Sequence, residues 1–338
     1  MKIHLRWPNR DDILELEKAN QAPWEPNFPF LHYFESLADS SFEKYLEILP
    51  LLSNKKNLPD GHVPCTFLIA FNQENEVVGR VSIRHELNEF LSNIGGHIGY
   101  GVTPSHRKKG YATKILFETL KYVRKNLPHL NEVLLTCDDD NVGSIKTIEK
   151  NGGHFVDYYT SPELKVPKRR YTISLPVVRR AKPQDAVTIH EAHMRSIQEV
   201  CSKDHSVEEI SAWGNRPYNE SMRLNAIEND FVWVVAHKGE VEGFGHLKVF
   251  DKDNLTKGHI WGLYLTQNVL GFGLGKEIFD LMLVEANKLQ AKILSLESSI
   301  TAHDFYKKLG FRDVGSMKTL EINGQPVRCF PMEMRLSN

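Results

Sequence analysis

Apolar and polar residues alternate along two stretches of the chain in the manner of half-buried β-strands. The stretches are TFLIAFNQENEVVGRVSIRH, residues 66–85, and FVWVVAHKGEVEGFGHLKVF, residues 231–250. In each, β-branched and aromatic residues flank a turn signal, which is Asn-Gln-Glu-Asn in the first stretch and Lys-Gly-Glu in the second. The period of two and the turn residues predict one antiparallel hairpin in each stretch.

Each hairpin is followed by another strand that leads into a glycine-rich turn and a long amphipathic helix. The strands are GGHIGYGVTP, residues 95–104, and KGHIWGLYLT, residues 257–266. Further along come VLLTCDDDNVGSIKTIEKNGG and ILSLESSITAHDFYKKLGF, which predict a buried strand, a polar loop, a helix and a glycine stop. The same elements therefore occur twice in the same order.

The separation between matching residues is nearly constant. His97 and His259 are 162 residues apart, Gly110 and Gly271 are 161 apart, and Asn141 and Ser299 are 158 apart. Internal duplication of this kind predicts two copies of one α/β domain, residues 1–175 and 176–338. RYTISL ends the first copy and PVVRRA begins the second, which leaves no room for a flexible linker.

Composition and charge narrow the class of protein. The 338 residues are 41% hydrophobic and 25% charged, as in globular proteins, and the length favours two domains. A net charge of −1 excludes a general attraction to nucleic acid or anionic membrane, so an anion site must be local. No stretch approaches the ~20 apolar residues of a membrane span, and the start MKIHLRWPNRDD lacks a signal peptide, so we expect a cytoplasmic protein without membrane or nucleic-acid partners.

Cysteine and histidine spacing gives no indication of a metal. The four cysteines are scattered without a Cys-x-x-Cys pair, which predicts reduced and mostly buried thiols. HEAH, residues 190–193, places two histidines three apart, whereas the zinc motif HExxH needs them four apart. We therefore expect no metal cofactor.

The two glycine turns predict anion sites. A strand that opens into a helix through small residues leaves the first helical N–H groups unpaired and open to an anion. The alternative is a tight turn with a purely structural role. The residues of the two predicted sites are Arg107, Lys108, Lys109, Gly110, Tyr111, Ala112 and Thr113 in the first copy, and Leu270, Gly271, Phe272, Gly273, Leu274, Gly275 and Lys276 in the second.

The first turn resembles the signature of a known family. Arg107-x-x-Gly110-x-Ala112 is similar to the Arg/Gln-x-x-Gly-x-Gly/Ala motif of the GCN5-related N-acetyltransferases (GNAT), and the resemblance covers nearly the whole chain as two domains. It implies in each a mixed, mostly antiparallel central sheet flanked by helices, with acetyl-CoA as co-substrate and its pyrophosphate at the turn. The second copy has Asn268 where the family has Arg or Gln, so we expect weaker binding there.

The resemblance also implies roles in catalysis. A backbone N–H at Val102 or Leu265 would stabilise the oxyanion formed at the thioester carbonyl. FYKKLGF, residues 305–311, matches the family pattern in which a tyrosine protonates the departing thiolate, which assigns this role to Tyr306. The alternative for Tyr306 is a half-buried aromatic residue. The first copy has Ile148 at the matching position, and an apolar side chain supplies no proton.

Other polar residues are assigned by position. Asn141 matches a family asparagine that contacts CoA, although it is equally placed for a helix N-cap. His97 and His259 lie on the strand before the turn, where the family often has a glutamate base, and imidazole titrates in a suitable range. Their alternative is a structural role, with Glu86, Glu297 and Asp304 as substitute bases.

These observations predict an acetyl-CoA-dependent N-acetyltransferase that moves an acetyl group to a primary amine by direct attack on the thioester, with the second domain as the favoured catalyst. One alternative makes the first domain catalytic and the second a scaffold; another is a non-catalytic acyl-CoA-binding regulatory module. The acceptor is a small-molecule or peptide amine. Acceptor loops would be residues 21–37, which suit an aromatic pocket or a domain-packing surface equally well, and residues 202–218.

Overall fold

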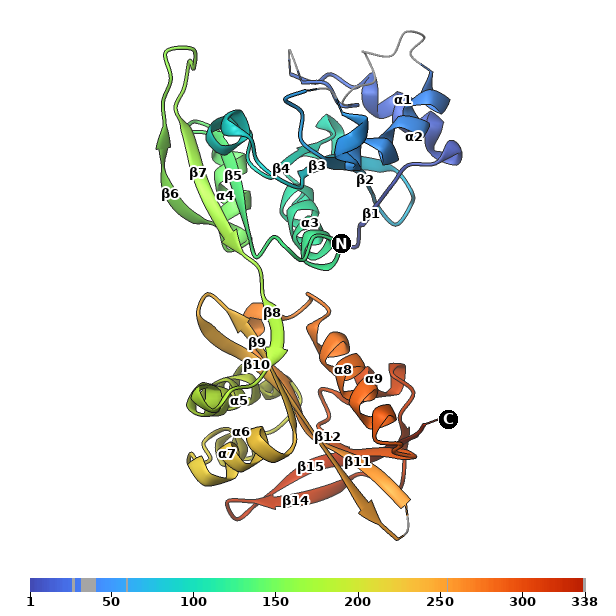
Figure 1. The fold of residues 1–338 in the computed structure, drawn as a ribbon, viewed down its shortest axis with the longest axis vertical. Helices are drawn as coiled ribbons and strands as arrows, with labels where there is room; N and C mark the ends of the chain where they lie inside the picture. Colours follow the sequence, from blue (N-terminus) through green and yellow to red (C-terminus); the bar gives the residue numbers. More distant parts are fainter. Residues whose placement is uncertain (26–27, 32–40, 59, 254, 337–338) are drawn as a thin grey trace. The chain divides into compact units, whose positions relative to one another are not determined.

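The computed structural model describes residues 1–338 except 26–27, 32–40, 59, 254 and 337–338. The chain separates into two compact units, Met1–Leu175 and Pro176–Asn338, coloured blue to green and green to red in Figure 1. Each unit is a mixed α/β domain built on antiparallel strands with flanking helices, as predicted. We call them the first and the second domain.

The first domain contains two sheets. The four-stranded sheet is antiparallel throughout, and its central pair is the predicted hairpin, with Phe71 opposite Val77 at the turn. In order across the sheet its strands are β1 (His4–Arg6), β2 (Cys65–Phe71), β3 (Val77–Arg84) and β4 (Ile98–Val102). The three-stranded sheet, also antiparallel, consists of β5 (Glu132–Asp138), β7 (Lys168–Ser174) and β6 (His154–Tyr159).

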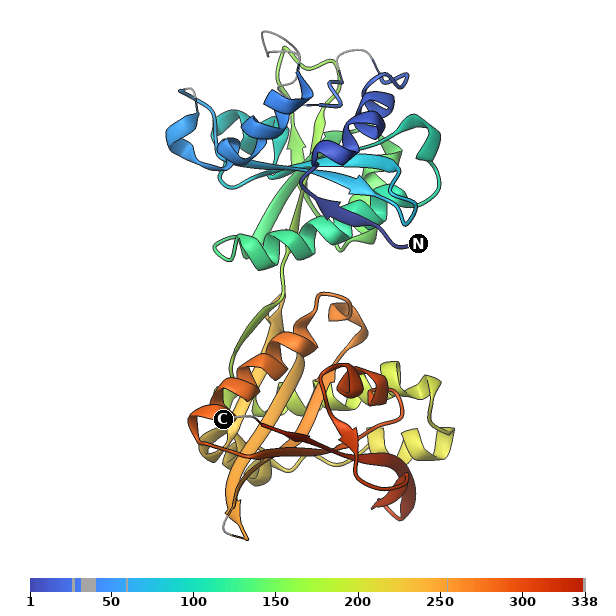
Figure 2. The same cartoon turned by 90° about the vertical axis from the view of Figure 1, so that its right-hand side faces the viewer.

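Helices cover both faces of the four-stranded sheet (Figure 2). On one face, alternate residues of β2 pack against α1 (Ile13–Asn20) and α2 (Phe42–Ile48) in a core that includes Phe30 and Tyr45. On the other, Ile115 of α3 (Tyr111–Asn126) lies against Gly79 of β3. The last helix is α4 (Val142–Lys150). The period of two along β2 thus divides its side chains between two layers.

The second domain has one eight-stranded sheet. The predicted hairpin is present as the β9–β10 pair, with Glu240 opposite His237. Across the sheet lie β13 (Arg312–Asp313), β15 (Gln325–Arg335), β12 (Ile293–Ser298), β11 (Leu255–Leu265), β10 (Glu240–Lys252), β9 (Phe231–His237) and β8 (Val177–Arg180), and β14 (Lys318–Ile322) pairs with β15. The β11–β12 pair is parallel, whereas the other pairs in this part of the sheet are antiparallel.

The helices of the second domain lie in two groups, one on each face of the sheet (Figure 1). The first group is α5 (Ala186–Val200), α6 (Val207–Gly214) and α7 (Glu220–Asn229). The second is α8 (Leu274–Lys288) and α9 (His303–Lys308). The main core joins α8 and α9 to the sheet through Ile278, Met282 and Leu294, all with no exposed surface. Among the described residues, no helix combines the length and apolarity needed to cross a bilayer.

Candidate functional site

A wedge opens in the second domain between β11 and β12. The two strands pair over only three residue pairs, of which the last is His259 with Ser295. Just beyond, Ile260 and Gly262 stand opposite consecutive residues of β10, so Trp261 forms a β-bulge. A bulge bends and twists its strand, and the rest of β11 therefore diverges from β12.

The backbone of Leu265 faces this wedge. Thr266 N–H donates to the Glu242 carbonyl at 2.9 Å, so the neighbouring pair of Leu265 with Gly243 is of the non-hydrogen-bonded type. The N–H and C=O of Leu265 therefore point away from β10. The C=O accepts a hydrogen bond from Ser196 Oγ at 2.8 Å, and the N–H faces the side from which β12 has diverged. An N–H in this position suits the predicted donor to an oxyanion.

Val102 occupies the same position in the first domain. Thr103 N–H donates to the Val78 carbonyl at 3.0 Å, so Val102 also directs its N–H and C=O away from the neighbouring strand, β3. Its C=O accepts a hydrogen bond from Arg107 Nε at 3.2 Å. On the side of β4 that faces away from β3, the sheet ends, because β5 belongs to a separate sheet. Both domains therefore present a strand-end N–H beside a gap in the sheet.

The two glycine turns have the same backbone. Gly110 is the N-cap of α3 with φ 85°, and Gly273 is the N-cap of α8 with φ 79°. Both are left-handed, and a Cβ on either would meet no atom within 4 Å. Open space at a left-handed N-cap fits a ligand that approaches the first helical N–H groups, as a phosphate does.

This geometry corrects the register of the sequence comparison. Gly110 matches Gly273, 163 residues later, and Val102 matches Leu265 at the same separation. Matching Gly110 to Gly271 was wrong, because Gly271 lies before the residue from which the helix starts, although its φ is also positive. The counterpart of Arg107 is therefore Leu270, and Asn268 donates instead to Glu242 at 3.1 Å.

The first turn is rich in cations, which are already partly engaged. Arg107 makes a bidentate ion pair with Glu25, at 2.5 and 2.9 Å, and its guanidinium lies 5.5 Å from the ring of Trp24. Lys109 Nζ donates to the Ser105 carbonyl, and Lys108 has a left-handed φ of 60°. The carboxylate of Glu25 therefore competes with any anion for Arg107.

Side chains around the helix starts differ in what they contact. Tyr111 packs edge-on against His106, and the carbonyl of Thr113 accepts from Asn151. In the second domain, Lys276 is paired with Asp280 at 2.7 Å, and Leu274 is fully buried in the core. Since Leu270 is apolar as well, the second turn offers an anion mainly its backbone.

Gly275 and the described part of the first predicted acceptor loop have packing roles. A Cβ on Gly275 would lie 3.3 Å from the ring of Phe305, so the glycine allows α8 and α9 to approach closely. In the first domain, Phe28 covers Gly101, and Phe30 and Leu31 are buried. The described part of this predicted acceptor loop thus packs on its own domain; residues 26–27 and 32–37 lie outside the described residues.

Tyr306 lies in α9 with 5% of its surface exposed. Its ring packs edge-to-face on Phe305 and Phe311, and its hydroxyl has no hydrogen-bond partner among the described residues. Burial, and then the nearby phenol of Tyr264, raise the pKa of Tyr306. The hydroxyl is therefore protonated at neutral pH. Ile148, at the matching position of α4, is buried and apolar.

Asn141 and Ser299, which precede the last helix of each domain, accept similar hydrogen bonds from the backbone. Asn141 Oδ1 accepts from the Ser144 N–H at 3.0 Å, and Ser299 Oγ accepts from the Ala302 N–H at 3.2 Å. The two hydrogen bonds are 158 residues apart, although α4 starts directly after Asn141 and α9 starts only at His303. Asn141 does serve as a helix N-cap, and this leaves its amide nitrogen as the group that could reach a ligand.

The geometry of His97 favours a structural role over that of the predicted base. The backbone N–H of His97 donates to the Leu134 carbonyl at 2.7 Å. The ring Nδ1 of His97 accepts from the backbone N–H of Leu134 at 2.9 Å. Burial, and then the positive charge of Arg84, lower the pKa of His97 to about 4. The imidazole thus joins β4 to β5, and its Nδ1 lone pair is already used.

His259 lies where β11 and β12 begin to separate. Its Nδ1 is 2.9 Å from Ser295 Oγ, and its Nε2 is 3.2 Å from a carboxylate oxygen of Glu297. The hydrogen bond from His259, with a further contribution from Lys318, lowers the pKa of Glu297 to about 2. A carboxylate, an imidazole and a hydroxyl therefore form one hydrogen-bonded chain. The sequence comparison did not identify Ser295, because serine in a strand carries no distinctive spacing.

Of the two substitute bases outside this chain, Glu86 is paired with Lys55 at 2.6 Å, and Asp304 is an exposed residue in the first turn of α9. The four cysteines are buried and unpaired, as predicted. Within the described ranges, no group of three or more His, Cys, Asp or Glu side chains is arranged to hold a metal ion.

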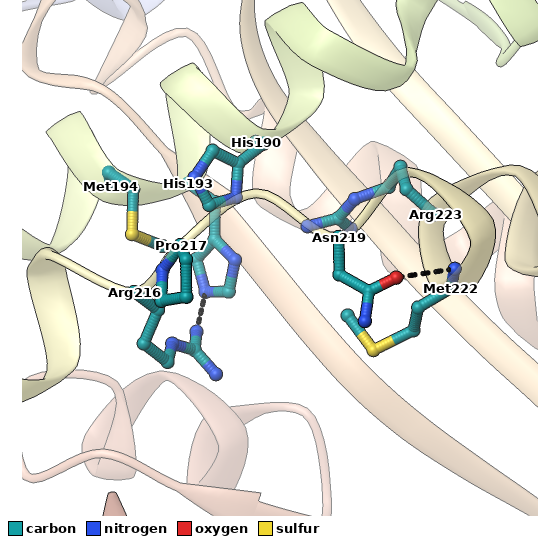
Figure 3. Close-up of a pocket in the computed structure, with 8 residues that line it drawn as sticks. All are labelled: His190, His193, Met194, Arg216, Pro217, Asn219, Met222 and Arg223. Carbon is teal, nitrogen blue, oxygen red and sulfur yellow. Dashed lines mark hydrogen bonds between the residues drawn. The ribbon is translucent and has the colours of Figure 1, made fainter. Parts of the chain in front are cut away.

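Sequence reasoning considered His190 and His193 only as metal ligands. The structure places both on α5 at a cavity closed by the segment before α7 (Figure 3). His193 Nε2 lies 3.2 Å from Arg216 Nη2, and its ring is 4.2 Å from that of Tyr264. The cavity is formed by tertiary packing, and no motif in the sequence marks it.

Comparison with known proteins gives consistent assignments for both domains. Two models described as acetyltransferase (GNAT) domains match the chain, one over residues 2–154 and the other over residues 201–336. Among curated proteins, no sequence matches this chain.

Solved structures with similar folds each match about half of the chain. A GCN5-related N-acetyltransferase from Rhodopseudomonas palustris has 24% identity and a TM-score of 0.42, covering 48% of this chain and 98% of its own. The PaiA N-acetyltransferase from Thermoplasma acidophilum, solved with coenzyme A, has 20% identity and a TM-score of 0.38, covering 48% and 99%. The ribosomal-protein-S18-alanine N-acetyltransferase from Escherichia coli has 14% identity and a TM-score of 0.36, covering 48% and 96%.

Proposed function

We propose, from the premise that this chain belongs to the GNAT acetyltransferase family, that it transfers an acetyl group directly from acetyl-CoA to a primary amine. Each half of the chain contains one such domain. The family is one of acetyl-CoA-dependent acyltransferases, and the assignment of chemistry to the second domain is our inference. The observation that carries it is the protonated, unpartnered phenol of Tyr306, where the first domain has Ile148.

The residues at the wedge fit acetyl-CoA. The open space at Gly273 and the first N–H groups of α8 would hold the pyrophosphate, and Gly110 with α3 would do so in the first domain. The co-substrate supplies a reactive thioester. The Leu265 N–H would donate to the carbonyl oxygen of that thioester, where negative charge develops during attack by the amine.

Tyr306 would protonate the departing thiolate. The phenol has no competing hydrogen-bond acceptor among the described residues, and burial keeps it protonated at neutral pH. Transfer of its proton as the carbon–sulfur bond breaks avoids release of a free thiolate. The core around α9 holds the ring between Phe305 and Phe311, which fixes the direction of the hydroxyl.

His259 would accept the proton that the amine loses. Its Nε2 is bonded to ionised Glu297, so a positive charge on the imidazole is stabilised by that carboxylate. The Nδ1 lone pair becomes available when the Ser295 hydroxyl turns toward the Gly258 carbonyl, which lies 3.3 Å from it. His97 has no such freedom, and we leave it out of proton transfer.

The first domain would bind acetyl-CoA without efficient turnover. It has the cation-rich turn and the Val102 N–H, but Ile148 gives it no proton donor at the last helix. A bound acyl-CoA there would act as a structural or regulatory ligand. The opposite assignment, with a catalytic first domain and the second domain as scaffold, is the outcome that the experiment distinguishes.

The test is Tyr306→Phe, measured as release of the CoA thiol from acetyl-CoA with a panel of amines. We expect kcat to fall by about 100-fold with little change in KM for acetyl-CoA, because general-acid catalysis contributes about 10²-fold or more. Tyr158→Phe, at an exposed position of the first domain, is the matched control. Full activity of Tyr306→Phe together with its loss in Gly110→Glu would make the first domain the catalyst and overturn the proposal.

A further inference from the structure

A small cavity in the second domain lies between α5 and α7 (Figure 3). Its volume is about 90 Å³, and one water molecule needs about 10–15 Å³ on the same measure. It therefore has room for a group of a few heavy atoms, and not for a whole ligand of ordinary size. The lining residues are His190, His193, Met194, Arg216, Pro217, Asn219, Met222 and Arg223.

The two arginines at this cavity lack a counter-charge. Arg223 is 8% exposed, and its guanidinium lies 5.1 Å from the ring centre of Phe244 without a hydrogen bond or ion pair to any described side chain. Arg216 donates from Nε to the Trp213 carbonyl at 3.2 Å and lies against His193. No carboxylate lines the cavity among the described residues.

Three other arginines of the second domain, Arg179, Arg195 and Arg328, are paired with carboxylates. Arg179 makes a bidentate ion pair with Asp185, at 2.7 and 2.8 Å. Arg328 is paired with Glu209 at 2.8 Å. The cavity thus brings together a buried guanidinium group, a half-buried one and two imidazoles, and no acid lines it among the described residues.

The positively charged groups at the cavity are partly removed from water. Burial lowers the pKa of Arg216 and, together with the charge of Arg216, that of Arg223. Burial and both guanidinium groups lower the pKa of His193 as well, so this imidazole is neutral at neutral pH. Buried cations without a partner are costly, and an anion between them would offset that cost.

The cavity is connected to the wedge through α5 and the end of β11. The ring of His193 contacts that of Tyr264, which precedes Leu265 in β11. Three residues along α5 from His193, Ser196 donates to the Leu265 carbonyl. A three-residue step along a helix rises about 4.5 Å, so the two contacts lie within one turn of α5.

We propose that the cavity between α5 and α7 is an anion subsite, in which Arg216 and Arg223 bind a carboxylate or phosphate group of the amine acceptor. Guanidinium groups suit both anions because their N–H donors match the oxygen pairs of either. The acceptor is thus an amine that carries a carboxylate or a phosphate. This inference rests on the proposed acetyl transfer, and its test separates the two.

The first experiment measures binding without catalysis. Inorganic phosphate and acetate are titrated into the full chain by calorimetry at constant ionic strength, with wild type, Arg216→Met, Arg223→Met and the exposed control Arg312→Met. We expect binding of at least one anion to wild type and to the control, and at least tenfold weaker binding to Arg216→Met and Arg223→Met. Binding that is undetectable in wild type, or equal in all four proteins, would overturn the subsite.

Arg223→Lys covers the case in which the methionine variants do not fold. Lysine keeps the positive charge and loses the planar pair of N–H donors. We therefore expect this variant to bind the anion more weakly than wild type but still detectably. If Arg223→Lys binds as tightly as wild type, two-point recognition by this guanidinium is wrong. Folding of each variant is checked by its thermal unfolding curve before titration.

The second experiment compares acceptors of similar size: ethanolamine, β-alanine and phosphoethanolamine. We expect kcat/KM for at least one anionic amine to exceed that for ethanolamine by tenfold or more, and Arg223→Met to remove the difference through KM. The better of the two anionic amines identifies the anion as carboxylate or phosphate. Equal values for all three amines would overturn the assignment to the acceptor. Binding of the anion without acetylation of any amine would contradict the proposed function and leave the subsite in place.

Discussion

The glycine turns of the two domains share a backbone and differ in their side chains. Gly110 and Gly273 are both left-handed N-caps beside a strand-end N–H that points away from the neighbouring strand. The first turn carries Arg107, and its domain has Ile148 where a proton donor is expected. The second carries Leu270, and its domain has Tyr306.

This difference teaches that the backbone geometry proposed for phosphate binding and the side chains proposed for proton transfer vary independently between the two domains. Backbone N–H groups are present whatever the side chains are, so either turn is able to bind an anion. Catalysis requires side chains at defined positions, and the second domain has a protonated phenol on its last helix and an imidazole bonded to an ionised carboxylate on the strands at the wedge. The duplicated domains therefore differ in that one has the more cationic turn and the other has the groups to which we assign catalysis.

The largest effect is expected from blocking each turn. Gly110→Glu and Gly273→Glu place a strained side chain and a negative charge at the phosphate position, since both glycines have positive φ. We expect each variant to lose one of two acetyl-CoA sites in calorimetry, with about 100-fold weaker binding at the altered site. The control is Gly239→Glu in the β9–β10 turn, which has φ +82° and the same open space. Retention of both sites in either variant would contradict this comparison.

The second effect concerns stability and is confined to the first domain. The pKa of His97 falls from 6.5 to about 4 on folding, so the unfolded chain binds the proton first as pH decreases. Stability from this group is fully present above pH 6.5 and is lost as pH falls toward 4, by on the order of 2 kcal/mol. His97→Asn keeps an acceptor for the Leu134 N–H and does not titrate, so its denaturant unfolding should vary less over this range.

Exposed His154 provides the matched control for that measurement. His154→Asn removes an imidazole from the same domain without altering the hydrogen bond between His97 and Leu134. A pH profile of His97→Asn that equals the wild-type profile would show that the bond between His97 and Leu134 does not determine the charge state of the imidazole.

A smaller effect is expected from freeing the cation at the first turn. Glu25→Gln removes the carboxylate that holds Arg107, so the guanidinium becomes available to a phosphate. In a Gly273→Glu background, which leaves only the first site, acetyl-CoA should bind about three- to tenfold more tightly. Exposed Glu163→Gln controls for the change in net charge. Weaker binding in Glu25→Gln would mean that Glu25 orients Arg107 for the ligand.

The smallest effect is expected from giving the second turn the missing cation. Leu270→Arg introduces a guanidinium at the position that matches Arg107, and in a Gly110→Glu background it should tighten acetyl-CoA binding about two- to fivefold. Leu289→Arg, at an exposed position at the end of α8, tests the effect of charge alone. If Asn268→Arg tightened binding and Leu270→Arg did not, the register of the two turns would have to be reassigned.

Local pattern accounts for much of the fold. Alternation of apolar residues predicted both hairpins, because a strand with one buried face requires a period of two. The glycines in the turns predicted where α3 and α8 begin to within two residues, whereas the match of Asn141 to Ser299 placed the start of α9 three residues too early. The error at Gly271 arose because two glycines with positive φ lie two residues apart, and only hydrogen bonding along α8 decides which one is the N-cap.

The sequence by itself determined the duplication, the strand and helix order, and the residue types at the last helix, since these follow from periodicity and internal comparison. Only the tertiary structure decided what individual side chains do. It paired Arg107 with Glu25, placed His97 between β4 and β5, linked His259 to Glu297 and brought Arg216 to the cavity of Arg223. Contacts between residues far apart in the chain depend on how strands diverge and helices pack, and no local spacing encodes them.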